Sequence, residues 1–175
     1  MGRLLRLGVI ILVVLVLQVE LVSDTRIFGV MPELLLGATI AAAWAAGPER
    51  GAGVGFVCGL LYDLYLPTPL ALSAITYVII GFGVGVASAT VAVSGERLIR
   101  RVVSTLGIAA GITLFVILGE LLGQSNLYND RFFAIVVIAS FSTALFMPLL
   151  HRAMQWAFGL HDVAARPPQR LTVVE

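Results

Sequence analysis

Four carboxylates lie in or beside long apolar segments of the sequence, and no other side chains have more scope for chemistry: Glu20, Glu33, Asp63 and Glu120. If these segments cross a membrane, an ionised side chain in the hydrocarbon costs roughly 3 kcal/mol and is expected to pair, to bind a cation or proton, or to line a polar cavity. The alternative is exposure at the outer membrane surface. Tyr65 and the Pro67-Thr68-Pro69 loop favour exposure for Asp63, but capping or pairing inside a bundle stays open.

Groups suited to covalent, metal or phosphate chemistry are scarce. The serines of the apolar segments have no helix-spaced histidine or lysine to act as a base: Ser73, Ser88 and Ser104. No glycine-rich loop carries the lysine of a phosphate cradle. Cys58 is the only cysteine, and His151 and His161 have no cysteine or carboxylate cluster at metal-ligand spacing. We therefore expect a non-enzymatic protein with no metal and no cofactor.

The composition predicts an all-α membrane protein. Hydrophobic residues make up 59% of the chain and charged residues 12%, against roughly 25% charged in soluble domains. Apolar runs predict a compact bundle of six transmembrane helices at about 4–22, 28–46, 51–66, 70–93, 102–123 and 132–150, followed by a disordered cytoplasmic tail at 161–175. The third run is short and contains Asp63, so a re-entrant segment is the alternative there.

The arginines predict the orientation of the bundle, because loops rich in Arg or Lys stay in the cytoplasm. With six crossings, only Arg26 and Arg131 fall on the outer side, and nine arginines fall on the inner side: Arg3, Arg6, Arg50, Arg97, Arg100, Arg101, Arg152, Arg166 and Arg170. We expect both termini in the cytoplasm. The basic loop with Arg97, Arg100 and Arg101 would meet anionic lipid or a cytoplasmic partner. The scattered cations do not suggest nucleic-acid binding.

A glycine stripe marks the third run. Gly51, Gly55, Gly59 and Asp63 recur every four residues, which places them on one face of a helix. Small residues at this spacing let another helix approach closely within a membrane. The stripe therefore predicts a helix-contact face that ends in a carboxylate.

The same run resembles a known signature. Gly55-Phe56-x-x-Gly59-Leu60-Leu61-x-Asp63 resembles that of MreD, the family of bacterial rod shape-determining membrane proteins. Pro32-Glu33-Leu34-Leu35 resembles the start of the second span of that family, and Gly47-Pro48-x-x-Gly51 resembles the turn before its signature helix. Thr68-Pro69-Leu70 resembles the start of its fourth span, although the next position, often Gly in the family, is Ala71 here.

The resemblance implies a non-enzymatic scaffold of the cell-elongation complex, which builds lateral peptidoglycan and maintains rod shape in the bacterial cytoplasmic membrane. The implied partner is an MreC-like single-span protein, with RodA, a class B penicillin-binding protein and the actin-like MreB nearby. The candidate helix-contact or partner-binding residues are Gly51, Gly55, Phe56, Gly59 and Asp63. Further polar or structural candidates are Pro32, Glu33 and Glu120.

The main alternative function is that of a substrate-binding membrane subunit of a vitamin-type transporter, since such subunits are also small six-span bundles. That function requires a polar pocket open to the outside, for which the four carboxylates are the obvious candidates. Binding of a small ligand that depends on Asp63 would favour this alternative. A catalytic intramembrane protein is disfavoured, because no base, nucleophile or metal set is found.

Overall fold

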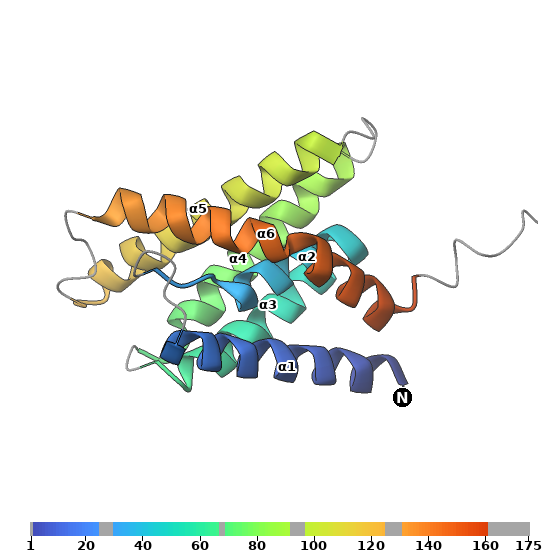
Figure 1. Cartoon of the computed structure of the whole chain (residues 1–175), viewed down its shortest axis with the longest axis horizontal. Coiled ribbons are helices and arrows are strands. Elements are labelled where there is room, and N and C mark those ends of the chain that lie inside the picture. Colours follow the sequence, from blue (N-terminus) through green and yellow to red (C-terminus); the bar gives the residue numbers. More distant parts are fainter. Residues whose placement is uncertain (1, 25–29, 67–68, 92–96, 125–130, 161–175) are drawn as a thin grey trace, which may run out of the picture.

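The computed structural model describes residues 2–24, 30–66, 69–91, 97–124 and 131–160, and in these ranges the chain forms six α-helices (Figure 1). They are α1 (Gly2–Asp24), α2 (Leu34–Ala46), α3 (Pro48–Asp63), α4 (Leu72–Val91), α5 (Arg97–Leu121) and α6 (Phe132–Phe158). For the residues in these ranges the prediction of an all-helical protein is confirmed. The four helices α1, α4, α5 and α6 are long and apolar enough to cross a membrane.

The helix boundaries differ from the predicted spans mainly at α2 and α6. The predicted segment 28–46 is helical only from Leu34, and the described residues before it, 30–33, are not helical. Pro32 explains the late start, because proline disfavours the helical conformation in the residue before it. At the other end of the chain, α6 continues beyond the predicted end at residue 150 to Phe158. The predicted tail, 161–175, lies outside the described residues.

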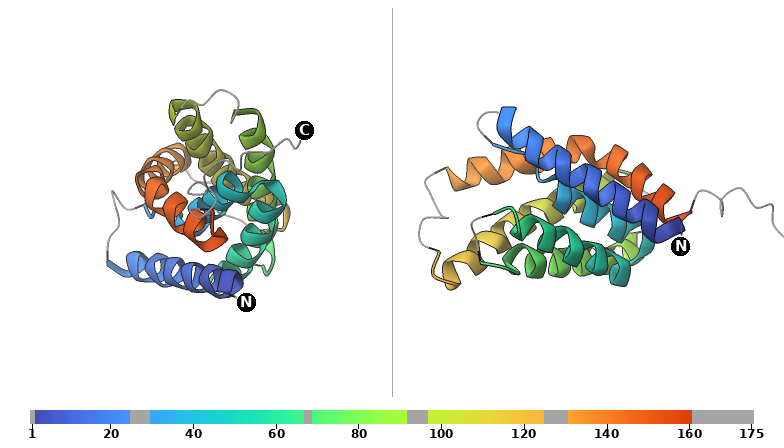
Figure 2. Two further views of the ribbon diagram at one scale, coloured as in Figure 1. Left: turned by 90° about the vertical axis from the view of Figure 1, so that its right-hand side faces the viewer. Right: turned by 90° about the horizontal axis from the view of Figure 1, so that it is seen from below.

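Helix α2 is the centre of the bundle. It contacts each of the other five helices, and the view along the long axis shows it surrounded by them (Figure 2, left). Every residue from Leu34 to Ala43 is buried. A helix that is apolar on all sides is suited to the interior of a bundle, because each of its faces packs against another helix. At 13 residues α2 rises only about 20 Å, which is shorter than the roughly 30 Å hydrocarbon core.

Two tight connections fix α3 between its neighbours. Gly47 alone joins α2 to α3, with a φ of +88° that glycine adopts without strain, and Pro48 is the first residue of α3. Past α3, Ala71 precedes α4 with a φ of +77°, in the left-handed region that glycine prefers. The backbone before α4 thus has the conformation for which a glycine would be better suited than Ala71.

The start of α1 and the end of α6 lie at the same end of the bundle (Figure 1). The Arg6 guanidinium stacks 5.0 Å from the ring centre of Trp156, and the Arg50 guanidinium lies 5.7 Å from that of Phe158. These cation–π contacts connect α1 and α3 to the last turns of α6.

Candidate functional sites in the bundle

The glycine stripe of α3 packs against helices of the same chain. A methyl group at Gly55 would lie 2.5 Å from the carbonyl oxygen of Tyr77, and one at Gly51 would lie 2.6 Å from the Ala43 methyl. A methyl group at Gly59 would collide with the backbone of Ala74. The stripe is therefore a helix-contact face, and within this chain α2 and α4 already occupy it.

Helix α4 contributes matching glycines to this contact, which we call the glycine seam (Gly51, Gly55 and Gly59 of α3; Gly81 and Gly85 of α4). A methyl group at Gly81 would lie 2.6 Å from the carbonyl oxygen of Gly51, and one at Gly85 would collide with Pro48. Missing side chains on both helices let the two backbones touch, which is how helices gain packing energy in a membrane.

Asp63 caps the start of α4. Its two carboxylate oxygens accept hydrogen bonds from the backbone N–H groups of Ser73, at 2.9 Å, and Ala74, at 3.2 Å. The side chain is only 2% exposed. Because the first N–H groups of a helix have no partner within the helix, an aspartate here satisfies two of them and interacts favourably with the helix dipole. The carboxylate that ends the glycine stripe thus holds α3 and α4 in register.

The other face of α3 is open. Phe56 is 52% exposed and Leu60 37% exposed, with Val57 and Leu64 beside them on the same outward side. The residues of the predicted set therefore divide in two. Gly55, Gly59 and Asp63 point into the bundle, whereas Phe56 presents an aromatic ring to whatever surrounds it.

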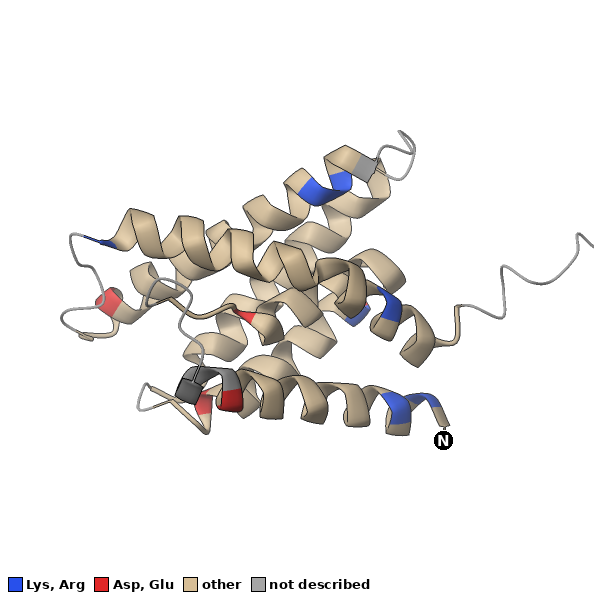
Figure 3. Ribbon diagram, in the orientation of Figure 1, with Lys and Arg blue, Asp and Glu red and all other residues tan. Residues whose placement is uncertain are grey.

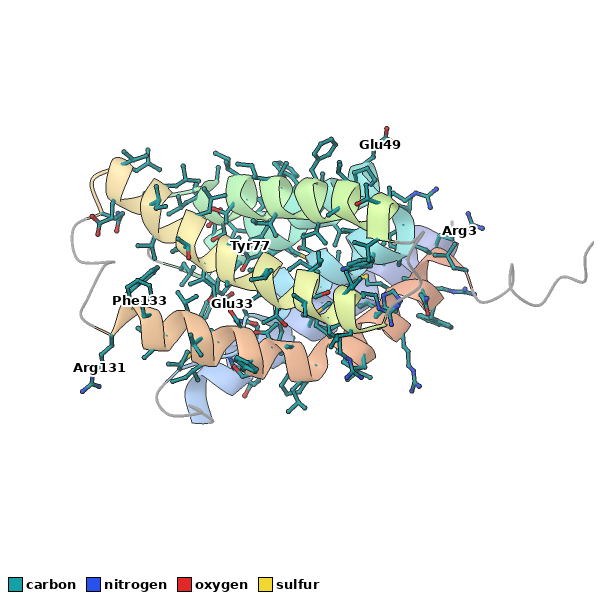
Figure 4. The ribbon with its side chains drawn as sticks, turned by 90° about the horizontal axis from the view of Figure 1, so that it is seen from above. Arg3, Glu33, Glu49, Tyr77, Arg131 and Phe133 are labelled. Carbon is teal, nitrogen blue, oxygen red and sulfur yellow. The ribbon has the colours of Figure 1, made fainter. Side chains whose placement is uncertain are left out.

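Glu33 lies in a second polar site, at the start of α2. The Tyr77 hydroxyl donates a hydrogen bond to Glu33 Oε2 at 3.1 Å, and both side chains lie among the helices (Figure 4). Tyr77 stacks on Tyr62, with 6.5 Å between ring centres. Tyr77 thus binds Glu33, and Ser73, about one helical turn earlier on α4, binds Asp63. Pro32, next to Glu33, is buried.

Side chains from α1 and α6 allow α2 to begin inside the bundle. The Leu34 N–H donates to Gln18 Oε1 at 2.7 Å, and the Glu33 N–H donates to Thr143 Oγ1 at 2.8 Å. Non-helical backbone at membrane depth is tolerated only where protein satisfies its polar groups. Gln18 is 1% exposed, and its side chain is also a hydrogen-bond neighbour of Tyr62.

Gln18, Tyr77 and Thr143 were not among the predicted site residues. Each is a polar residue in an apolar segment, and such residues often form hydrogen bonds between membrane helices. That signal marks the segments but not these residues alone, because Thr76 stands next to Tyr77 and Ser142 next to Thr143. Their shared position around the start of α2 could not be read from residues as distant as 18 and 143.

Charge is distributed unevenly along the bundle. Arginines gather mostly at the end where α1 begins, and acidic residues gather mostly toward the opposite end (Figure 3). Arg3 and Arg131 lie at opposite ends, and Glu49 shares the end with Arg3 (Figure 4). Glu120 is exposed near the end of α5. Arg100 and Arg101 are exposed in the first turns of α5, whereas the side chain of Arg97 lies outside the described part of the chain.

The described residues contain no group of three or more histidine, cysteine, aspartate or glutamate side chains that could hold a metal ion. Compared with known proteins, the chain matches no family model, no curated protein and no solved structure.

Proposed function

We propose that this protein is a non-enzymatic membrane scaffold of the bacterial cell-elongation complex, with six crossings of the cytoplasmic membrane and both termini in the cytoplasm. Its resemblance to the MreD signature supplies the class. The proposed partner is an MreC-like single-span protein, in a complex with RodA, a class B penicillin-binding protein and MreB.

The proposal rests on the two faces of α3, which use different residues of the signature. Gly55, Gly59 and Asp63 are used inside the chain, at the glycine seam and at the cap of α4. Phe56 and Leu60, from the same signature, are exposed on the outer face of α3. A rigidly held helix with an aromatic and aliphatic outer face offers a packing surface for a single transmembrane helix of a partner. We therefore assign the partner contact to Phe56 and Leu60 and not to the glycines.

The uneven charge supports the proposed orientation. Arginines predominate at the end that holds the start of α1 and the end of α6, and arginine-rich ends stay in the cytoplasm. Fusions at the C-terminus test this part: a fluorescent protein should fluoresce and alkaline phosphatase should be inactive. An active phosphatase fusion would contradict the orientation without touching the partner assignment.

The decisive experiment is co-purification with an MreC-like protein from gently solubilised membranes. We expect Phe56→Ala/Leu60→Ala to reduce capture of the partner about tenfold or more, which corresponds to roughly 1.4 kcal/mol. Ile75→Ala/Ile79→Ala is the matched control, since both isoleucines are exposed to similar extents on the neighbouring α4. Unchanged capture by the α3 variant, or normally shaped rods after complete loss of the protein, would refute the proposal.

One observation favours the alternative of a small-molecule transporter subunit. Gln18, Glu33 and Tyr77 bring polar side chains together at the start of α2. A small polar ligand could form hydrogen bonds with this group of side chains. Saturable ligand binding that is lost in Glu33→Gln and kept in Phe56→Ala/Leu60→Ala would favour this function. Asp63 is a poor probe of it, because its substitution uncaps α4.

A further inference from the structure

A cleft of about 1030 Å³ lies at the arginine-rich end, between α5 and α6. The ends of α2 and α4 also line it, through Trp44, Ala45 and Val91. In Figure 1 the end of α4 and the start of α5 rise away from the C-terminal half of α6. Pro148 lies inside α6 and lines the cleft. Pro48, in contrast, packs in the glycine seam on the other side of the bundle. Proline within a helix removes a backbone hydrogen bond and bends the helix.

The cleft is polar at one end and apolar at the other. Arg100, Arg101 and Arg152 line it together with His151 and Gln155, and no described lining residue is acidic. The remaining wall from α6 is apolar and consists of Phe141, Ala144, Met147 and Pro148. From Phe141 to Gln155 the wall rises about 21 Å, which exceeds half of a roughly 30 Å hydrocarbon core. These dimensions suit one leaflet and its headgroup layer.

The hydrogen bonds at the polar end leave donors for an anion. Arg100 Nη1 lies 3.4 Å and Gln155 Nε2 lies 3.1 Å from His151 Nε2. Both neighbours can only donate, so His151 Nε2 is the acceptor and the ring carries its proton on Nδ1. A guanidinium has five N–H donors, so this contact uses only a small part of the capacity of Arg100. Arg101 and Arg152 are exposed beside it.

Trp44 borders the cleft from the end of α2. Three arginines at one end and an apolar wall at the other together match a molecule with an anionic head and a hydrocarbon tail.

We infer that this cleft binds an anionic phospholipid, with its phosphate at Arg100, Arg101 and Arg152 and an acyl chain along Phe141, Ala144 and Pro148. Basic pockets between membrane helices on the cytoplasmic side are a recurrent kind of phospholipid headgroup site. The inference rests on the proposed orientation of this end toward the cytoplasm but not on the scaffold role, because it concerns the side of the bundle formed by α5 and α6 and requires no protein partner.

The test measures lipids retained by the full-length protein. The protein is reconstituted into vesicles of equal phosphatidylglycerol and phosphatidylcholine, extracted gently, and examined by native mass spectrometry. We expect preferential retention of phosphatidylglycerol. Arg100→Gln/Arg152→Gln should reduce this retention about thirtyfold, because each of the two arginines attracts the anionic headgroup by a similar amount. Arg3→Gln/Arg6→Gln removes the same charge at the same end outside the cleft and should change retention by less than about threefold.

A second variant separates a seated lipid from charge alone. Ala144→Phe fills the apolar part and leaves every arginine in place, so we expect it to lower retention about tenfold. Equal losses in the two arginine variants, retention unaffected by Ala144→Phe, or complete displacement of the lipid by inorganic phosphate would each overturn the inference. A retained polypeptide in place of a lipid would overturn it as well.

Discussion

The contacts between α3 and α4 and between α5 and α6 are built in opposite ways. At the glycine seam the two backbones touch, and a carboxylate from one helix caps the next. At the other side, α5 and α6 diverge around a cleft lined by arginines and apolar side chains. The buried share of each helix reflects this difference. In the candidate membrane span of α4 44% of the residues are buried, against 28% in the candidate spans of α5 and α6. The seam fixes one side of the bundle, and the cleft leaves the other side able to accept a molecule from the membrane.

The seam should tolerate no enlargement. We expect Gly59→Leu to cost more than about 3 kcal/mol of folding free energy, because the new side chain would meet the backbone of Ala74. Gly53→Leu is the matched control on the same helix, since nothing lies within 4 Å of a methyl group there. Unfolding in micelles with increasing dodecyl sulfate, followed by circular dichroism, measures both. Equal stability of the two variants would show that the seam is not tightly packed.

The cap should matter nearly as much as the seam. Asp63→Ala leaves the N–H groups of Ser73 and Ala74 buried without their acceptor, which we expect to cost about 2 kcal/mol. Asp63→Asn keeps one acceptor oxygen and should lose about half as much. Glu20→Ala, at an exposed position of α1, serves as the control in the same unfolding assay. A loss in Asp63→Asn as large as in Asp63→Ala would instead point to the charge as the main contribution.

The turn into α4 should improve with glycine. Ala71 has a φ of +77°, so we expect Ala71→Gly to raise stability by about 0.5 kcal/mol after the added chain entropy of glycine is deducted. The same replacement inside α4, Ala87→Gly, should lower stability by about 0.5–1 kcal/mol. Thermal unfolding in detergent compares the two. Destabilisation by both would mean that the Ala71 backbone is not strained.

The cleft should accept a larger side chain at the smallest cost. We expect Ala144→Phe to change the stability of the lipid-free protein by less than about 0.5 kcal/mol, because the residue lines open space between α5 and α6. Thermal unfolding of delipidated protein gives the value. A loss as large as that of Gly59→Leu would remove the contrast between the two sides of the bundle.

Much of the architecture follows from local sequence. Continuous apolar runs predicted the helices, and the resemblance of Gly47-Pro48-x-x-Gly51 to a family turn implied the break that divides α2 from α3. The four-residue glycine spacing indicated a close helix contact, but it could not name the neighbour. Three glycines spaced along one face of a helix can pack equally well against a helix of the same chain and against a helix of a partner. Only the fold shows that α2 and α4 fill that face.

The polar sites depended still more on tertiary structure. The sequence marked Asp63 and Glu33 as costly residues in an apolar setting, because that cost depends on residue type and context alone. Their partners lie outside the local pattern: Asp63 meets Ser73 and Ala74 in the next helix, and the segment at Glu33 meets Gln18 and Thr143. A local pattern cannot specify which distant polar groups meet, since the packing of whole helices decides it. The sequence by itself thus determined the helices and the residues that needed partners, and the tertiary structure decided which partners they have.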